Sequence, residues 1–155
     1  MLLDGVINKL DSTEQFLLKT MEGLEECDGP FTPKEGMFTL CQHVAHVAQT
    51  VDWFLEGMYQ GQFNEDFESL ESKILEIKTL SEAKAWLTKA FEDARNTLTK
   101  KGEVALKERL PPGPIMGGVP RYIVVGAISD HTAHHRGSIA VYIRLLGKEP
   151  SMPYV

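Results

Sequence analysis

The chain has five histidines, and they fall into two short windows about 85 residues apart. The first window holds His43 and His46, and the second holds His131, His134 and His135. Imidazole nitrogens bind divalent transition metals, and three of them around one ion leave coordination positions open, as in catalytic zinc sites. The clustering therefore predicts a metal site, and three ligands favour a catalytic site over a closed structural one.

Helical geometry decides which imidazoles can meet, because both windows lie in segments with the apolar spacing of amphipathic helices. His131 and His135 are four residues apart, so they share one helix face with roughly 5 to 6 Å between Cβ atoms, while His134 points to the other side of His131. A third ligand would come from the first window. The helical angles place His43 closer to the apolar stripe, whereas neighbouring residues extend the buried face toward His46. Periodicity leaves both open, with a slight preference for His43.

Four segments carry this helical periodicity, and no segment has the alternation of a β-strand. The helices are expected from Leu2 to about Leu24, from an N-cap at Thr39 to near Gly61, from an N-cap at Ser81 to residues 100–102, and from Pro120 or Arg121 to Leu146 with Gly147 as the stop. We therefore predict an all-α fold, a four-helix bundle with long loops that forms a single domain over residues 1–155.

The connectors are predicted from their composition. Residues 60–79 are polar and acidic, with a short helix expected at 70–77, and residues 103–110 are expected to form a short extended piece. Residues 111–120 are rich in proline and glycine, which exclude helix and strand. This loop is expected at one end of the bundle, where it could form a rim.

Composition excludes several function classes. The chain has 155 residues and a formal net charge of -6, with no basic face, so nucleic acid and anionic membranes are not expected partners. The first fifteen residues lack the features of a signal peptide, and no apolar run reaches the ~18 residues of a membrane span. We expect a cytoplasmic protein in which the two cysteines, Cys27 and Cys41, are free thiols.

The two histidine segments together resemble the DinB-like (YfiT-like) superfamily of metal-binding four-helix bundles. The resemblance spans nearly the whole chain and is carried by TLCQHVAHVAQTVDW at 39–53 and HTAHHRGSIAVYIRLLG at 131–147. It implies His46, His131 and His135 as the metal ligands, and so selects His46 where periodicity preferred His43. Zinc and nickel both suit imidazole ligands, so we expect one of these two ions. Ser138 departs from the family pattern, which often has glutamine there.

The resemblance also implies candidate functions. Three neutral imidazoles leave a bound dication strongly Lewis acidic, which suits a metal-dependent hydrolase or thiol S-transferase acting on a small molecule, with a low-molecular-weight thiol as co-substrate. The alternatives are a non-catalytic metal-binding or stress-response protein and a helical interaction module without metal. A homodimer is expected from the family. Residues expected around the ion or the substrate are His43, His134, Arg136, Ser138 and Tyr142, with Arg121 as a further anion-binding candidate.

Overall fold

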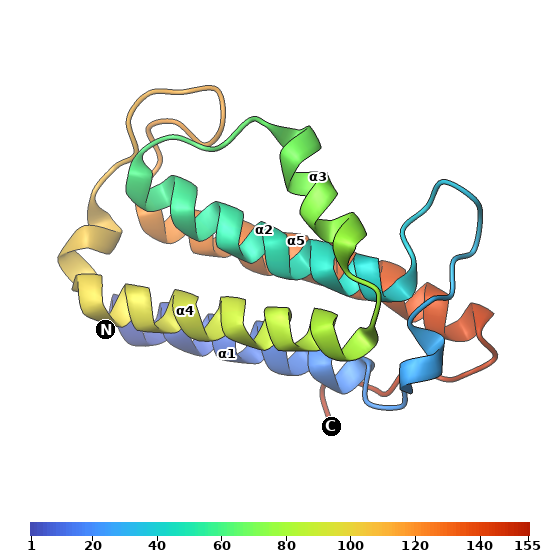
Figure 1. The fold of residues 1–155 in the computed structure, drawn as a ribbon. Coiled ribbons are helices and arrows are strands. Elements are labelled where there is room, and N and C mark those ends of the chain that lie inside the picture. Colours follow the sequence, from blue (N-terminus) through green and yellow to red (C-terminus); the bar gives the residue numbers. More distant parts are fainter.

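The computed structural model describes residues 1–155 and contains five α-helices, four of them long (Figure 1). No strand is present, and the only β-type pairing is an isolated bridge between Arg109 and Pro120. The all-α prediction is confirmed, with one short helix added to the expected four. The helices are α1 (Leu2–Thr20), α2 (Leu40–Gln60), α3 (Phe67–Glu76), α4 (Leu80–Lys107) and α5 (Arg121–Leu145), with a 3₁₀ turn, η1, at Glu26–Asp28.

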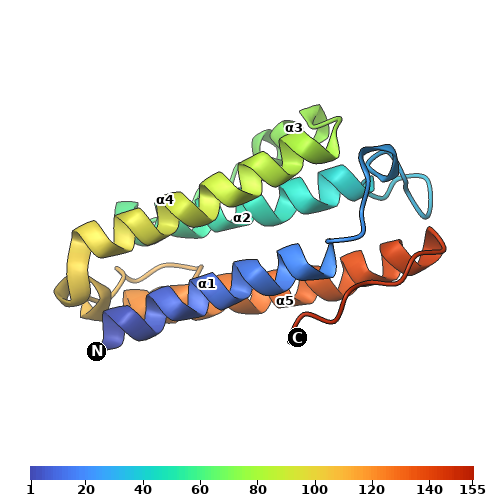
Figure 2. The same cartoon turned by 90° about the horizontal axis from the view of Figure 1, so that it is seen from below.

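The four long helices form a bundle in two layers. Figure 2 shows α2 beside α4 in one layer and α1 beside α5 in the other, and the contacts of α2 with α5 and of α1 with α4 join the layers. The chain runs in one direction in α1 and α5 and in the opposite direction in α2 and α4 (Figure 1). Because α2 and α4 are parallel, the chain must return along the bundle between them. The α3 segment makes this return and packs on α2.

The helix α2 begins where the sequence predicts. The Thr39 hydroxyl accepts a hydrogen bond from the backbone N–H of Gln42, and the Gln42 side chain accepts one from the backbone N–H of Thr39. This reciprocal capping box satisfies two N–H groups that the first turn would otherwise leave unpaired. The helix ends at Gly61, whose φ of 80° is the left-handed conformation that glycine adopts without strain.

The predicted N-cap of α4 was wrong. Thr79 caps this helix through Glu82, and Ser81 already lies inside the first turn. The Ser81 hydroxyl donates instead to the carboxylate of Glu26 at 2.5 Å. Threonine and serine are both common N-cap residues, so residue type alone does not distinguish Thr79 from Ser81.

Two further boundaries differ from the sequence prediction. The helix α1 ends at Thr20 rather than near Leu24. Met21 and Leu24 are still buried, although residues 21–23 form a turn, so the apolar spacing continues beyond the end of the helix. At the other end, α4 has a non-helical break at Gly102 (φ 79°), after which residues 103–107 are helical, not extended. The ion pair between Lys107 and Glu103 at 2.6 Å, and the fully buried Leu106, account for this extra turn.

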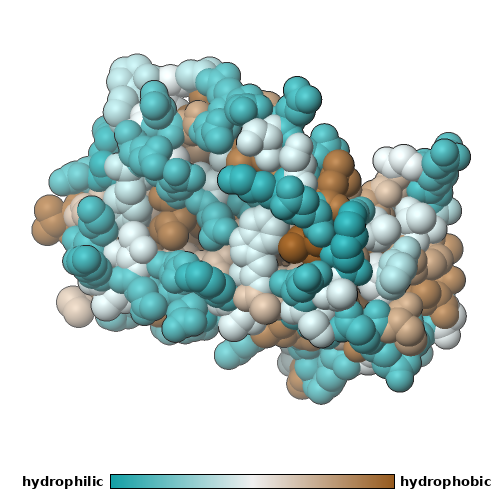
Figure 3. Space-filling view, viewed as in Figure 1, coloured by the Kyte–Doolittle hydropathy of each residue, from teal (hydrophilic) through white to brown (hydrophobic).

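The bundle core is one cluster of 30 buried apolar residues. The proline- and glycine-rich loop after α4 lies at one end of the bundle, as predicted (Figure 1). The face shown in Figure 3 is mostly hydrophilic, with small apolar patches beside α3. No helix combines the length and the apolar composition needed to cross a membrane. Cys27 and Cys41 are free thiols, as expected.

Candidate metal centre

The two histidine windows lie on neighbouring helices. His43 and His46 are on α2, and His131 and His135 are on α5. The two helices pack against each other, so the imidazoles of one helix can reach those of the other.

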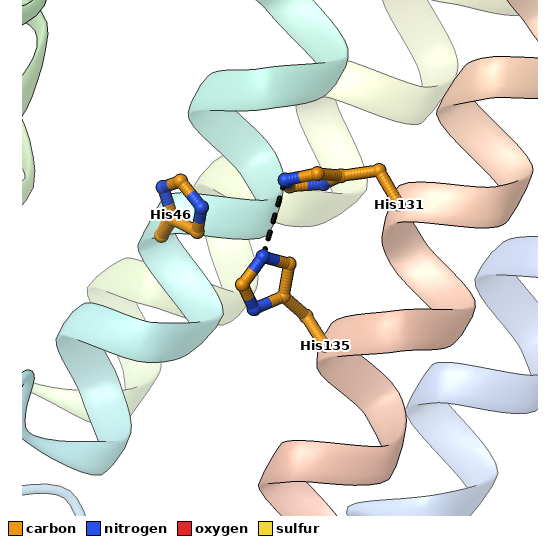
Figure 4. A group of neighbouring side chains, drawn as sticks. All are labelled: His46, His131 and His135. Atoms are coloured by element: carbon orange, nitrogen blue, oxygen red, sulfur yellow. Dashed lines mark hydrogen bonds between the residues drawn. The ribbon is translucent and has the colours of Figure 1, made fainter.

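Three imidazoles converge between α2 and α5. One ring nitrogen from each of His46, His131 and His135 lies within 4.8 Å of the other two, and Figure 4 shows the rings turned toward one another. The Nε2 atoms of His131 and His135 are 3.1 Å apart. The ring centroids of His46 lie 5.2 Å from that of His131 and 4.6 Å from that of His135. This is a compact group of three nitrogen donors without a carboxylate among them.

The environment keeps these imidazoles neutral. Burial, together with a smaller repulsion from the neighbouring histidines, lowers the pKa of His131 to about 4 and that of His135 to about 3. Burial also lowers the pKa of His46, against a smaller opposing effect of Glu71. Neutral imidazole is the form that donates an electron pair to a metal. In addition, Nδ1 of His46 is fully buried and has no hydrogen-bond partner in the chain.

His43 lies directly behind this group. Its Nε2 is 2.8 Å from Nδ1 of His135, and its ring packs edge-on against Tyr142 at a centroid distance of 5.0 Å. The Tyr142 hydroxyl donates to the backbone carbonyl of Phe38 at 3.1 Å, which ties α5 to the loop before α2. His43 therefore contacts Nδ1 of His135, whose Nε2 faces His131, and Tyr142 packs on the ring of His43. Burial lowers the pKa of His43 to about 4 and raises that of Tyr142.

The other predicted neighbours point elsewhere. His134 is exposed, although its ring touches that of His135 edge-on at 4.9 Å. The Arg136 guanidinium stacks near the ring of Phe16 and donates to the Tyr154 hydroxyl at 3.2 Å. The Ser138 hydroxyl donates to the carbonyl of His134 within the same helix at 3.4 Å. Arg136 thus lies against α1 and the C-terminal segment.

Arg121, the further anion-binding candidate, has a structural role at the end of the bundle. It donates to the carbonyl oxygens of Met58 and Ala105 at 2.8 and 3.1 Å, and it forms an ion pair with Glu108. These contacts tie the start of α5 to the ends of α2 and α4. Its Nε and Nη1 donors are therefore occupied by the protein itself.

A pocket of about 360 Å³ opens beside the histidines, and we call it the α2–α3 pocket. His46 and His131 lie on its wall, whereas His135 does not. Its apolar lining is contributed by α2, by α3 and by the loop before α2: Phe38, Trp53, Phe54, Phe67, Leu70 and Ile74. Its remaining lining residues are Gln49, Thr50 and Glu71. The histidine group therefore faces a small-molecule-sized space through two of its three members.

No local pattern in the sequence indicates this pocket. Gln49 follows His46 by one helical turn, and this spacing could have placed it on the same face. The outer wall comes from α3, whose position depends on how the connector folds back over α2. No local sequence pattern in residues 60–79 predicts that this connector folds back over α2.

Comparison with known protein families gives one match. A family model described as the DinB family matches residues 7–155, which is nearly the whole chain. A search of curated proteins finds no significant match.

Proposed function

Since this chain belongs to the DinB family and brings three neutral histidines together, we propose that it binds one divalent metal ion through His46, His131 and His135. The observation that supports the proposal most strongly is the approach of three ring nitrogens, from two helices, to within 4.8 Å of one another. We expect this ion to be zinc or nickel, because both suit imidazole ligands.

The donor set of the chain fits such an ion. Three unprotonated imidazoles without an ammonium or guanidinium group among them can accept a dication with no charge clash, and the buried Nδ1 of His46 lacks any partner within the protein. His43 supports the arrangement from outside. A ligand that binds metal through Nε2 carries its proton on Nδ1, and His135 would donate that proton to Nε2 of His43, which fixes its tautomer and ring orientation.

We further propose that the site is catalytic, as a metal-dependent thiol S-transferase or hydrolase. An ion held by three imidazoles supplies Lewis acidity that lowers the pKa of a water or thiol. The chain's own contribution is geometric. His46 and His131 lie on the wall of the α2–α3 pocket, so a molecule in the pocket lies next to the ligands, and the aromatic rings of Phe38 and Phe54 lie 5.7 and 6.4 Å from those two histidines and shield them from water.

The second candidate is a non-catalytic metal-binding protein, in which the ion only stabilises the contact between α2 and α5. The buried hydrogen bond between His43 and His135 fits this function as well as it fits an enzyme. The α2–α3 pocket favours the enzyme, because a purely structural site needs no space for a substrate beside its ligands.

Metal analysis of untagged protein tests the metal proposal. We expect about one zinc or nickel ion per chain in the parent protein and a loss of metal when His46, His131 or His135 is replaced by alanine. The matched control is His134→Ala, which removes an exposed imidazole from the same helix and should leave the metal content unchanged. Equal metal contents in the parent and in the His131→Ala, His135→Ala double variant would refute the site.

Activity is tested separately on protein shown to contain metal. A panel of low-molecular-weight thiols is combined with alkylating, acylating and epoxide electrophiles, and ester hydrolysis is measured in parallel. Turnover that disappears in His131→Ala and persists in His134→Ala supports the enzyme. A fully loaded protein that turns over none of these pairs, yet melts at a higher temperature with metal, supports the non-catalytic alternative.

A further inference from the structure

Besides its histidines, the α2–α3 pocket contains a buried polar side chain whose hydrogen-bonding capacity is unused. Gln49 lines the pocket and is only 7% exposed, and its amide forms no hydrogen bond with any other residue. The amide atoms of Gln49 are not completely enclosed by protein, and the residue lines the pocket. A buried amide without a partner is costly. The structure therefore has a donor and an acceptor available for a ligand at this point.

The other polar residues of the pocket do not compete for that role. The Thr50 hydroxyl donates to the carbonyl of His46 at 2.9 Å, so its proton is already used. Glu71 is exposed on α3, at the outer wall. Gln49 lies one helical turn from His46, and it is therefore the pocket amide next to the histidine group.

The charge of the pocket selects against anions. No lysine or arginine lines it, and its one charged residue is Glu71. Arg121 and Arg136, which the sequence suggested as anion ligands, form ion-pair, carbonyl and aromatic contacts elsewhere. In the metal-free chain, an anionic ligand would lose its hydration on entering an apolar space in which no side chain supplies a positive charge to replace it. An uncharged ligand has no such cost.

The walls select for apolar shape. Trp53, Phe54 and Phe67 supply aromatic faces, and Leu70 and Ile74 supply aliphatic surface from α3. Aromatic and branched side chains of this kind pack well against a flat ring or a branched hydrocarbon. A volume of about 360 Å³ is at the small end of ligand pockets, which suits a single ring system with a short substituent.

We propose that the α2–α3 pocket binds an uncharged small molecule with an apolar aromatic or aliphatic body and one carbonyl or amide group, and that Gln49 hydrogen-bonds to this polar group. The proposal extends the proposed function, because it assigns the electrophilic substrate to this pocket and places its polar end beside His46. Gln49 is then a residue that determines specificity.

Binding of three matched probes tests this assignment. The probes are 4-butylbenzamide, 4-butylbenzoate and butylbenzene, which share one apolar body and differ in the polar group. They are titrated into metal-free protein, because a carboxylate could otherwise bind the ion directly. Binding is followed by NMR at the two tryptophan indoles, assigned with Trp53→Phe. Trp53 lines the pocket, whereas Trp86 donates to Asp52 outside it and serves as an internal control.

We expect the amide to shift the Trp53 signal saturably, with little effect on Trp86, and to bind at least about tenfold more tightly than the carboxylate. In Gln49→Leu, which keeps a similar volume, the affinity for the amide should fall roughly three- to tenfold, the size of one net hydrogen bond. Butylbenzene should bind this variant at least as well as the parent. Gln60→Leu, at an exposed position of the same helix, should change none of these affinities.

Equal affinity for amide and carboxylate, an unchanged affinity of Gln49→Leu for the amide, or no shift of Trp53 with any probe would overturn the assignment. The same titrations on metal-loaded protein separate this inference from the proposed function. A protein that binds the amide but no metal retains the pocket and loses the metal proposal. If the protein binds metal but none of the probes, the metal proposal stands and the assignment of the pocket fails.

Discussion

At the scale of single residues, His43 is placed to hold the ring of His135 in its orientation. It is 7% exposed, and its Nε2 lies 2.8 Å from Nδ1 of His135, whose Nε2 faces His131. Replacing His43 with phenylalanine keeps a ring against Tyr142 and removes the hydrogen bond to His135. We expect the affinity for zinc to fall roughly 10- to 100-fold with one ion still bound at saturation. Competition against a chromophoric chelator measures this change.

His43→Gln provides the matched control for that experiment. A glutamine can still accept a hydrogen bond from Nδ1 of His135, so it should recover part of the lost affinity. If His43→Phe and His43→Gln bind zinc as tightly as the parent protein, His43 has no positioning role. If His43→Phe abolishes binding even at saturating zinc, His43 would be a ligand itself.

Helical periodicity favours His43 as the third ligand, whereas the compact group of ring nitrogens contains His46. Helical angles rank residues by burial, and His43 is indeed the more buried of the pair. A group beside an open pocket must instead lie at the edge of the core, where His46 lies with partial exposure. The resemblance carried this distinction and the hydrophobic pattern did not.

Asp52 gives a prediction about pH and stability that is independent of metal. Burial raises the pKa of Asp52, against the lowering effect of the hydrogen bond from the Trp86 indole at 2.7 Å, while Asp93 and Glu56 raise it further. A carboxyl whose pKa is raised by folding stabilises the protein below its unfolded pKa of about 3.9 and loses that contribution as the pH rises through its folded pKa. Charged Asp52 therefore destabilises the fold at neutral pH.

We expect Asp52→Asn to increase the free energy of unfolding at pH 7 by less than about 1 kcal/mol, because solvent screens this partly exposed carboxylate. The amide oxygen can still accept from Trp86. Urea denaturation at several pH values measures the difference between the variant and the parent, which should shrink as the pH falls toward 3.5. A difference that does not depend on pH would contradict the prediction.

At the scale of helices, the close contact between α2 and the segment after it supports a wall of the pocket. A Cβ added at Gly57 would lie 2.3 Å from Cδ1 and 2.8 Å from Cγ of Phe63. The Phe63 ring packs against Trp53 at a centroid distance of 4.9 Å, and Trp53 lines the α2–α3 pocket. Glycine inside a helix normally costs about 0.5–1 kcal/mol relative to alanine. Here it is required because the ring occupies the space of a side chain.

Gly57→Ala should therefore destabilise the protein by about 1–3 kcal/mol, since steric displacement of Phe63 outweighs the gain in helix propensity. Chemical denaturation measures the loss. The matched control is Gly126→Ala in α5, where a Cβ meets no atom within 4 Å, and this change should stabilise by about 0.5–1 kcal/mol. If both substitutions are stabilising, Phe63 does not hold this position in solution.

The helices differ in how far the sequence could predict them. The start and end of α2 and the end of α5 follow from Thr39, Gly61 and Gly147, because capping chemistry and left-handed glycines act over a few residues. The path of α3 depends on packing against α2, a contact between segments that local periodicity does not encode. The histidine windows could likewise be recognised from the sequence, because residues three or four apart on one helix share a face. The pocket beside them could not be recognised, because its outer wall depends on how α3 packs on α2.

At the scale of the whole molecule, the histidine group joins the two layers of the bundle. His46 comes from the layer of α2 and α4, and His131 and His135 come from the layer of α1 and α5 (Figure 2). The chain between His46 and His131 includes α3, α4 and the loop at the bundle end. An ion bound here would cross-link segments far apart in sequence, and binding only to the folded state stabilises that state by mass action.

Removal of metal should therefore lower the melting temperature of the whole protein. With free zinc at about 100 times its dissociation constant, the folded state gains roughly 2.7 kcal/mol, which corresponds to a rise of roughly 5–10 °C for a chain of this size. Differential scanning calorimetry across a series of zinc concentrations, with a chelator-treated reference, measures it. His131→Ala should show no dependence on zinc, while His134→Ala should follow the parent. Because the proposed ligands belong to both layers, we expect one cooperative unfolding transition whose midpoint temperature rises with zinc. A zinc-dependent shift confined to a minor early transition would show instead that the ion stabilises only a local segment.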